Sequence, residues 1–226
     1  YERCDENQYW WVRSAVSHYC GKDQFYLLRR LSYDWVGKDT HLFTQSSIDY
    51  DDYLMFAVNS KSYLTDQIYL RKIAKIDYRT LGPWQLIDEN GNKSEVLTDE
   101  LGTVIASAEY EKEGQEQGDL PLSRYNEQRV DDVEDVINNP RKYLQHAGAF
   151  FHYRFAYMEN GIWHPTCVVT LTRTRYRSDE IKDRQTSVAY YDGFGRTVES
   201  RSYAGDDKWL ASGRVQYNAK GDVARS

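Results

Sequence analysis

Proline, methionine and cysteine are all scarce in this chain of 226 residues, which contains 4, 2 and 3 of them. Three widely spaced cysteines make a poor disulfide framework and lack the spacing of zinc ligands. A Cys4–Cys20 bridge stays open as an alternative to the simpler interpretation of free or buried thiols. The sequence predicts no metal and no cofactor.

Long apolar runs and an excess of basic residues are also missing. No segment approaches the roughly 18 apolar residues that a membrane-spanning helix needs. The net charge of -6 argues against a nucleic-acid binder, which needs a basic face to neutralise phosphates. The chain does not open with the pattern of a signal peptide, and from Tyr1 onward it already reads as ordered sequence. We expect a piece of a longer protein, with no membrane insertion by this segment and no nucleic-acid partner.

The common catalytic motifs are absent, including the nucleophile elbow, the phosphate loop and the zinc-protease helix. Of five scattered histidines, His152 and His164 come nearest to a metal or Cys–His site, with Cys167 close by in sequence. The acidic clusters at 49–52 and 131–132 resemble paired carboxylates, although turn and helix-start roles explain them more simply. The sequence predicts no catalytic residue, and a hydrolase is the weakest function class considered.

Tyrosine, in contrast, is abundant, with 20 copies among aromatics that make up 15% of the chain. Tyrosine favours strands whose faces are half buried. Short runs of β-branched and aromatic residues recur with turn signals about every ten residues, which is typical of an antiparallel all-β structure. Their simplest role is to fill sheet faces. Functionally, they also suit contact with an unfolded polypeptide or stacking on pyranose rings.

Three stretches of the strand pattern need interpretation. Residues 54–58 and 62–64 read as separate short strands. Residues 68–78 fit helix and strand spacing about equally, and their β-branched and aromatic content favours a strand. In residues 162–176, Arg173 and Arg175 alternate with valine and threonine in a pattern that continues to Arg177. This alternation predicts a basic side that faces solvent.

Residues 130–144 change to helical spacing. Val130, Val133, Val136 and Ile137 recur on one face, and acids gather near the start, where the helix dipole favours them. Asn139-Pro140 stops or kinks the helix. We therefore predict a short helical insert near 130–145.

The chain is divided accordingly into four parts. These are an uncertain N-terminal strand segment (1–23), a β-strand repeat region (24–110), a polar loop with the helical insert (111–148), and a β-strand region with Tyr-Asp-type repeats (149–226).

Four turns share the pattern of an Asp or Asn followed three residues later by glycine. The clearest runs from Tyr191 to Arg196, and looser copies begin at Asp88, Asp99 and Asn218. The Asp or Asn side chain bonds to backbone two residues on, and glycine takes the conformation with positive φ. Four copies indicate a repeated strand–turn–strand unit. The candidate turn residues are Tyr191, Asp192, Gly193, Gly195, Arg196, Asn90, Gly91, Asp99, Gly102, Tyr217, Asn218 and Gly221.

The ordered set of turns resembles the Tyr-Asp (YD) repeats of the rearrangement-hot-spot (RHS) family. It is more similar still to the middle-to-C-terminal region of the B component (TcB/SpvB-like) of insecticidal toxin complexes, the Tc toxins. Three segments carry the resemblance: residues 76–102, 191–196 and 209–221. Residues 50–56 fit weakly upstream, and residues 1–23 show no match. The resemblance covers most of residues 24–221.

The resemblance implies an all-β fold whose antiparallel strand–turn–strand repeats form part of an RHS-type shell. It implies a non-catalytic, secreted segment of a toxin complex, whose shell encloses and shields a cytotoxic cargo polypeptide. The implied partners are the cargo-bearing C component and, through other parts of the parent chain, the A channel component. The alternative is a cell-surface or glycan-recognition module built from YD repeats.

Overall fold

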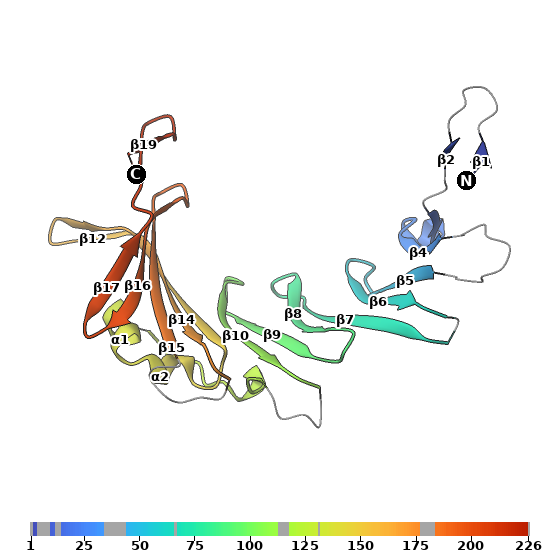
Figure 1. Cartoon of the computed structure of the whole chain (residues 1–226), viewed down its shortest axis with the longest axis horizontal. Helices are drawn as coiled ribbons and strands as arrows, with labels where there is room; N and C mark the ends of the chain where they lie inside the picture. The colour runs from blue at the N-terminus through green and yellow to red at the C-terminus, as the bar shows by residue number, and fades with distance from the viewer. Residues whose placement is uncertain are drawn as a thin grey trace. The chain divides into compact units, whose positions relative to one another are not determined.

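The computed structural model of the chain describes residues 2–3, 10–11, 15–33, 44–65, 67–112, 118–130, 132–176 and 184–225. The chain divides into two compact units, residues 1–93 and 94–226, which run from blue to green and from green to red in Figure 1. Within the described ranges, no helix is long and apolar enough to cross a membrane.

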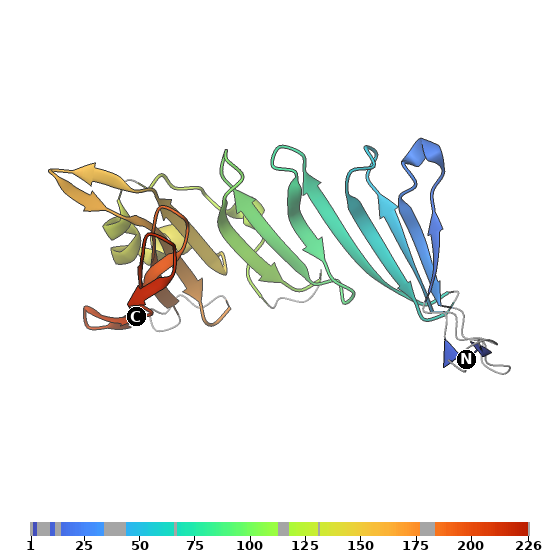
Figure 2. The same cartoon turned by 90° about the horizontal axis from the view of Figure 1, so that it is seen from above.

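The first unit is a meander in which β3 to β8 lie side by side in one layer (Figure 2), each strand antiparallel to the next. A further short pair joins β1 and β2. The elements are β1 (Glu2–Arg3), β2 (Trp10–Trp11), β3 (Val16–Tyr19), the 3-10 helix η1 (Lys22–Gln24), β4 (Leu28–Tyr33), β5 (Thr44–Tyr50), β6 (Ala57–Tyr63), β7 (Tyr69–Asp77) and β8 (Gly82–Ile87).

This first sheet has no apolar core of its own within its described part. The residues that are buried there are both polar, Asp51 and Gln85. Leu70 and Leu86 remain 44% and 48% exposed. A single layer cannot bury both of its faces, so backbone pairing and cross-strand contacts hold this sheet together.

The strand interpretation of residues 68–78 is confirmed, because β7 pairs with β6 on one side and β8 on the other. The prediction of separate strands at 54–58 and 62–64 is wrong. The polar stretch Asn59–Lys61 interrupts the apolar pattern, yet it pairs with β5 and β7 inside one continuous β6. Backbone pairing on both sides does not depend on apolar side chains.

The second unit combines a larger antiparallel sheet with the helical insert. Its strand order is β9-β10-β11-β14-β15-β16-β17, and β12–β13 and β18–β19 form separate hairpins. The elements are β9 (Lys93–Thr98), β10 (Val104–Tyr110), the 3-10 helix η2 (Leu122–Arg124), α1 (Val133–Asn138), α2 (Pro140–Leu144), β11 (Ala149–Arg154), β12 (Tyr157–Glu159), β13 (Ile162–His164), β14 (Thr166–Arg173), β15 (Arg184–Tyr191), β16 (Thr197–Gly205), β17 (Lys208–Ser212), β18 (Gln216–Tyr217) and β19 (Val223–Arg225).

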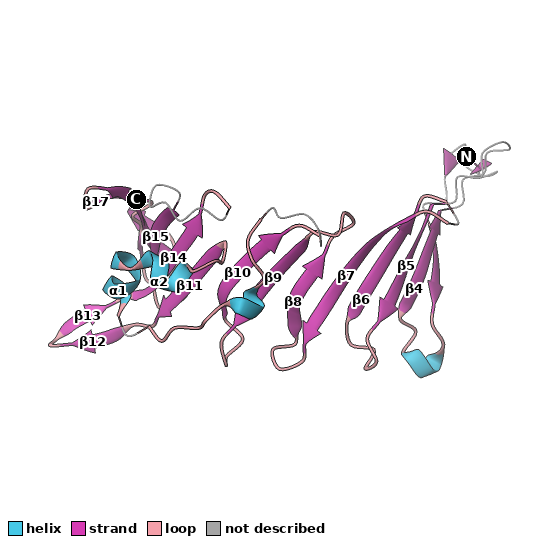
Figure 3. Ribbon diagram, turned by 90° about the horizontal axis from the view of Figure 1, so that it is seen from below, coloured by secondary structure: helices cyan, strands magenta, loops and turns pink. Residues whose placement is uncertain are grey.

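The helical insert supplies the second layer of this unit. Figure 3 shows α1 and α2 on one side of β11 and β14, and their apolar residues close the core. Tyr143 is fully buried and stacks on Phe150 with ring centroids 5.5 Å apart. Pro140 is the first residue of α2, where its missing N–H costs nothing. The predicted all-β fold with a short helical insert near 130–145 is confirmed.

The predicted basic, solvent-facing side of residues 162–176 is wrong at Arg173. Along β14 the buried positions are Cys167, Val169 and Leu171, so the two-residue period places Arg173 on the same face. At the end of the strand its guanidinium turns to donate a hydrogen bond to the Gln145 carbonyl after α2. Arg175 is exposed, and Arg177 lies outside the described residues.

Leu171→Ala tests whether this core carries the stability of the second unit. Leu171 is 1% exposed, so truncation should leave a cavity and lower the free energy of unfolding by about 2–5 kcal/mol in a denaturant titration. The same truncation at Leu210, which is 67% exposed, is the matched control and should change little. Equal losses at both positions would contradict the assignment of the core.

Candidate functional site

The four predicted turns share one hydrogen-bond pattern. In each, the side-chain Oδ1 of the Asp or Asn accepts backbone N–H groups from the residues two and four positions later, at 2.8–3.0 Å. The sequence predicts the bond from the residue two positions later. The bond from the residue four positions later was not predicted. The acceptors are Asp88, Asp99, Asp192 and Asn218.

The backbone of these turns is equally uniform. The backbone N–H of the Asp or Asn donates to the carbonyl four residues later, and its own carbonyl accepts the N–H of the glycine three residues later, at 2.9–3.1 Å. The glycine at the third position has a φ of 76–88°, which is the left-handed region that glycine enters without a Cβ clash. One side-chain oxygen and one glycine therefore close each turn. The glycines are Gly91, Gly102, Gly195 and Gly221.

Asp51 forms a fifth, longer version of the same turn. Its Oδ1 accepts the N–H groups of Met55 and Phe56 at 2.7 and 2.9 Å. Leu54 occupies the third position with a φ of 59°, where the shorter turns have glycine. The stretch at 50–56 that fits the YD pattern only weakly in sequence thus adopts its geometry.

A tyrosine connects this fifth turn to the next strand pair. The Tyr78 hydroxyl donates to Asp51 Oδ2 at 2.8 Å, and its ring meets that of Tyr53 edge-on at 5.2 Å. This bond to the carboxylate, together with burial, raises the pKa of Tyr78 to about 12. Burial alone would raise the pKa of Asp51, but hydrogen bonds from Phe56, Tyr78 and Met55 hold it below its usual value.

Arg196 couples the clearest turn to the following one. Its Nε donates to Asp192 Oδ2 at 2.7 Å within its own turn, and its Nη1 donates to the Gly221 carbonyl at 3.0 Å. The guanidinium also lies 3.9 Å from the centre of the Tyr217 ring, a cation–π contact. A Cβ on Gly221 would lie 2.8 Å from Nη1, so a larger residue there would push the guanidinium away from this contact.

The remaining candidate residues lie around these turns. Tyr191 ends β15 at a register shift and pairs with Thr197. Gly193 has open space where a Cβ would stand, and Asn90 donates its N–H to Asp88. The Tyr217 hydroxyl donates to the Thr197 carbonyl at 3.1 Å.

The side chains considered for catalysis do not converge. The strand register sets His152 opposite Val169 and His164 opposite Tyr157, on whose ring it stacks at 4.5 Å. Burial, together with Arg154, lowers the pKa of His152. Burial also raises the pKa of the Cys167 thiol. Among the described residues no group of three or more His, Cys, Asp or Glu could hold a metal ion.

The acidic clusters have separate roles where they are described. Asp49 accepts a hydrogen bond from Asn59, and Asp51 closes its turn. Asp132 precedes α1 at the N-cap position. Asp131 lies outside the described residues, as does Cys4 of the Cys4–Cys20 alternative.

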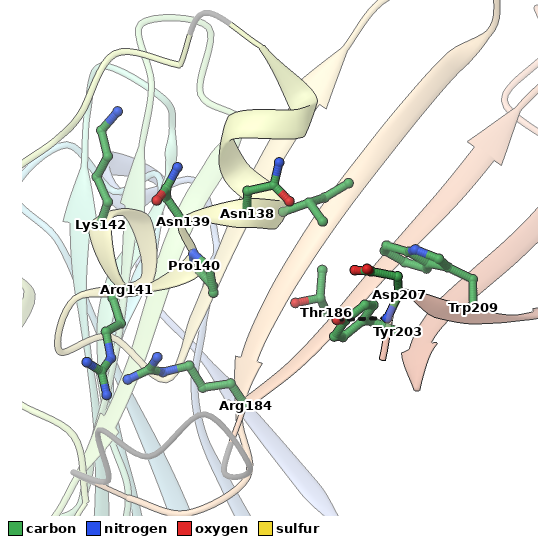
Figure 4. A pocket seen from close by; sticks show the side chains of 11 residues that line it. Asn138, Asn139, Pro140, Arg141, Lys142, Arg184, Thr186, Tyr203, Asp207 and Trp209 are labelled. Atoms are coloured by element: carbon green, nitrogen blue, oxygen red, sulfur yellow. Dashed lines mark hydrogen bonds between the residues drawn. The ribbon is translucent and has the colours of Figure 1, made fainter. Parts of the chain in front are cut away.

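One cleft of about 530 Å³ was not foreseen from the sequence. It lies between the helical insert and β15–β17, and Figure 4 shows two groups of side chains on its walls. Arg141 and Arg184 point toward one another on one side, while Tyr203, Asp207 and Trp209 gather on the other. These residues are up to 68 positions apart, so only the fold brings them together.

Comparisons with known proteins agree with this architecture. No protein-family model matches the chain, and no curated protein matches it. Among solved structures, the crystal structure of TcdB2–TccC3 aligns with 93% of the chain at a TM-score of 0.75 and 23% identity. The Photorhabdus luminescens Tc holotoxin pore aligns with 99% at a TM-score of 0.78 and 18% identity. The chain has a Tc toxin fold.

The Tc toxin resemblance drawn from the YD turns is therefore confirmed at the level of the fold. The structure of TcdB2–TccC3–Cdc42 is a further neighbour, with a TM-score of 0.74 over 92% of the chain and 19% identity. The chain spans 10–13% of the length of these Tc toxin chains.

Gly195→Ala tests the backbone requirement of the turn. Nothing lies within 4 Å of a Cβ at this position, so the cost comes from the positive φ alone. We expect a loss of about 1–2 kcal/mol in the free energy of unfolding, and a larger loss for the β-branched Gly195→Val. The control is Gly193→Ala, which also has open space but no positive φ, and should be nearly neutral. Equal effects at 193 and 195 would contradict the assigned geometry.

Asp192→Asn tests the charge in the same turn. Burial alone would raise the pKa of Asp192, but bonds from the Arg196 backbone and guanidinium and from the Phe194 N–H outweigh it and lower the pKa. Because the pKa of Asp192 is lower in the folded chain than the unfolded value of about 3.9, its ionised carboxylate stabilises the fold above that pH. This stabilisation is lost as the pH falls through the folded pKa. Asparagine keeps the backbone bonds, as Asn218 does, but cannot titrate.

Denaturant titrations between about pH 5 and pH 2 should therefore show a weaker pH dependence of stability in Asp192→Asn than in the wild type. Asp206→Asn is the control, because Asp206 lies in an exposed turn whose carboxylate accepts no hydrogen bond from the described residues. An unchanged pH dependence in Asp192→Asn would contradict the account.

Proposed function

We propose that the chain is a non-catalytic structural segment of a toxin-complex B component, contributing to a β-strand shell that encloses and shields a cytotoxic cargo polypeptide. The observation that carries the proposal is the fold match to Tc toxin structures over 92–99% of the chain. The residues that the sequence singles out support it, because they act on backbone and neighbouring turns.

The single-layer sheet of the first unit also supports a wall role. A sheet in the wall of a shell needs extended strands whose backbone N–H and C=O groups are paired. Its two faces are covered by the shell's contents on one side and by other parts of the assembly or solvent on the other. The exposed Leu70 and Leu86 lie on such a face.

The proposal assigns the chain a cargo-bearing partner of the TccC3 kind, since the matched structures contain TcdB2 and TccC3 together. The A channel component is the proposed partner of other parts of the parent chain. Secretion as part of the complex completes the proposal.

The alternative function is a cell-surface or glycan-recognition module. It is favoured by the many exposed aromatic side chains, such as Trp163 at 62% and Tyr53 at 67%. A glycan array on the full chain tests this alternative, since saturable binding that is lost in Trp163→Ala supports recognition through the exposed aromatic side chains, whereas a wall predicts no such loss.

Protease protection of the cargo tests the shell role. The full parent chain is co-expressed with its cargo-bearing partner, and the cargo is probed by limited proteolysis. We expect the cargo to be protected with the wild-type chain and to be cleaved faster with Gly195→Val, while Gly193→Ala behaves as the wild type. A cargo that is fully exposed beside the wild-type chain would contradict the proposal.

A further inference from the structure

The cleft in the second unit has a rigid aromatic corner. Tyr203 of β16 and Trp209 of β17 meet edge-on with centroids 5.3 Å apart and an interplanar angle of 64°. The turn between them has Asp206 and Asp207 at φ values of 50° and 57°. The Asp207 N–H donates to the Tyr203 hydroxyl at 3.4 Å, the dashed line in Figure 4. The corner therefore presents ring surface and a carboxylate in one place.

The facing wall is cationic. Arg141 of α2 and Arg184 of β15 turn their guanidiniums toward one another at one side of the cleft (Figure 4). A guanidinium has five N–H donors in a planar fork, so it can keep one partner and still bind a carboxylate. Lys142, the next residue along α2, forms an ion pair with Asp135 at 2.8 Å.

Between these walls lie neutral hydrogen-bonding groups. Asn138 and Asn139 come from the helical insert, and Thr186 comes from β15. Amides and hydroxyls both donate and accept, which suits a ligand with several hydroxyl groups. The volume of about 530 Å³ is in the range of pockets that hold small ligands.

We propose that this cleft binds an acidic sugar, a pyranose that carries a carboxylate. The ring stacks in the Tyr203–Trp209 corner, the carboxylate meets Arg184 and Arg141, and the hydroxyls bond to Asp207 and the amides. An acidic peptide could also bind the guanidiniums. It has no pyranose ring to stack on Tyr203 and Trp209, however, and its additional carboxylates would be repelled by Asp207. The proposal is separate from the shell role, and either can fail without the other.

The test measures binding of sialyllactose to the full chain by calorimetry, with lactose as the uncharged probe. We expect saturable binding of sialyllactose and at least tenfold weaker binding of lactose, about 1.4 kcal/mol. Arg184→Gln should remove this preference, and Trp209→Ala should weaken binding of both sugars. Arg141→Gln, a change at an exposed position of the cationic wall, avoids the risk to folding that Trp209→Ala carries, and should weaken sialyllactose binding severalfold.

Matched controls come from outside the cleft. Arg214→Gln changes an arginine whose side chain is 80% exposed, and Trp163→Ala removes a tryptophan that is 62% exposed on the separate β12–β13 hairpin. Both should bind sialyllactose as the wild type does. No saturable binding at millimolar sialyllactose, equal binding of lactose, or binding unchanged in both Arg184→Gln and Arg141→Gln would overturn the proposal. Binding only of an acidic peptide, such as oligoglutamate, would overturn it as well.

Discussion

A single side-chain oxygen that accepts two backbone N–H groups is the interaction on which these hairpins depend. At Asp192 the oxygen holds the N–H groups of Phe194 and Arg196 at 2.9 Å, and Gly195 takes the positive φ that lets the chain reverse. A tight turn leaves backbone donors without strand partners. The Asp or Asn side chain supplies the missing acceptor, so strand pairing can begin directly on either side.

Contacts between turns extend this local order to neighbouring strand pairs. Arg196 joins its own Asp192 to the carbonyl and ring of the next turn, and Tyr78 reaches back to the carboxylate of Asp51. The hydrogen bonds from Arg196 to Gly221 and from Tyr78 to Asp51 join residues 25 and 27 positions apart. Repetition of one motif thus fixes both the hairpin and its neighbour, which is how repeat proteins build extended sheets from short units.

The turns and the fold class were predictable because their chemistry is local. An Asp or Asn with glycine three residues later has few alternatives to a turn, and the helical period of 130–144 stands out against the strands. The link from Arg196 to Gly221 was not predictable, since no local pattern marks a contact over 25 residues. Arg173 was placed on the wrong face because the helical insert, not the alternation itself, decides which side of β14 is buried.

The cleft was missed for the same reason. Arg141 and Trp209 have no relation in sequence, and each alone is an ordinary surface residue. They line one cleft only because the insert covers one side of a sheet whose last strands return beside it. Such residues form a site only in the folded chain. The turns with an Asp or Asn and a glycine three residues later can, in contrast, be recognised in any strand-rich sequence.

Amide hydrogen exchange on the full chain tests the central claim most directly. If one oxygen holds each turn, the N–H groups of Phe194 and Arg196 should exchange much more slowly than that of Gly193, for which the described residues give no acceptor. Asp192→Ala should remove the protection at both amides and leave the middle of β15 protected. Fast exchange of the Phe194 and Arg196 amides in the wild-type chain, at the rate of an open loop, would contradict the account.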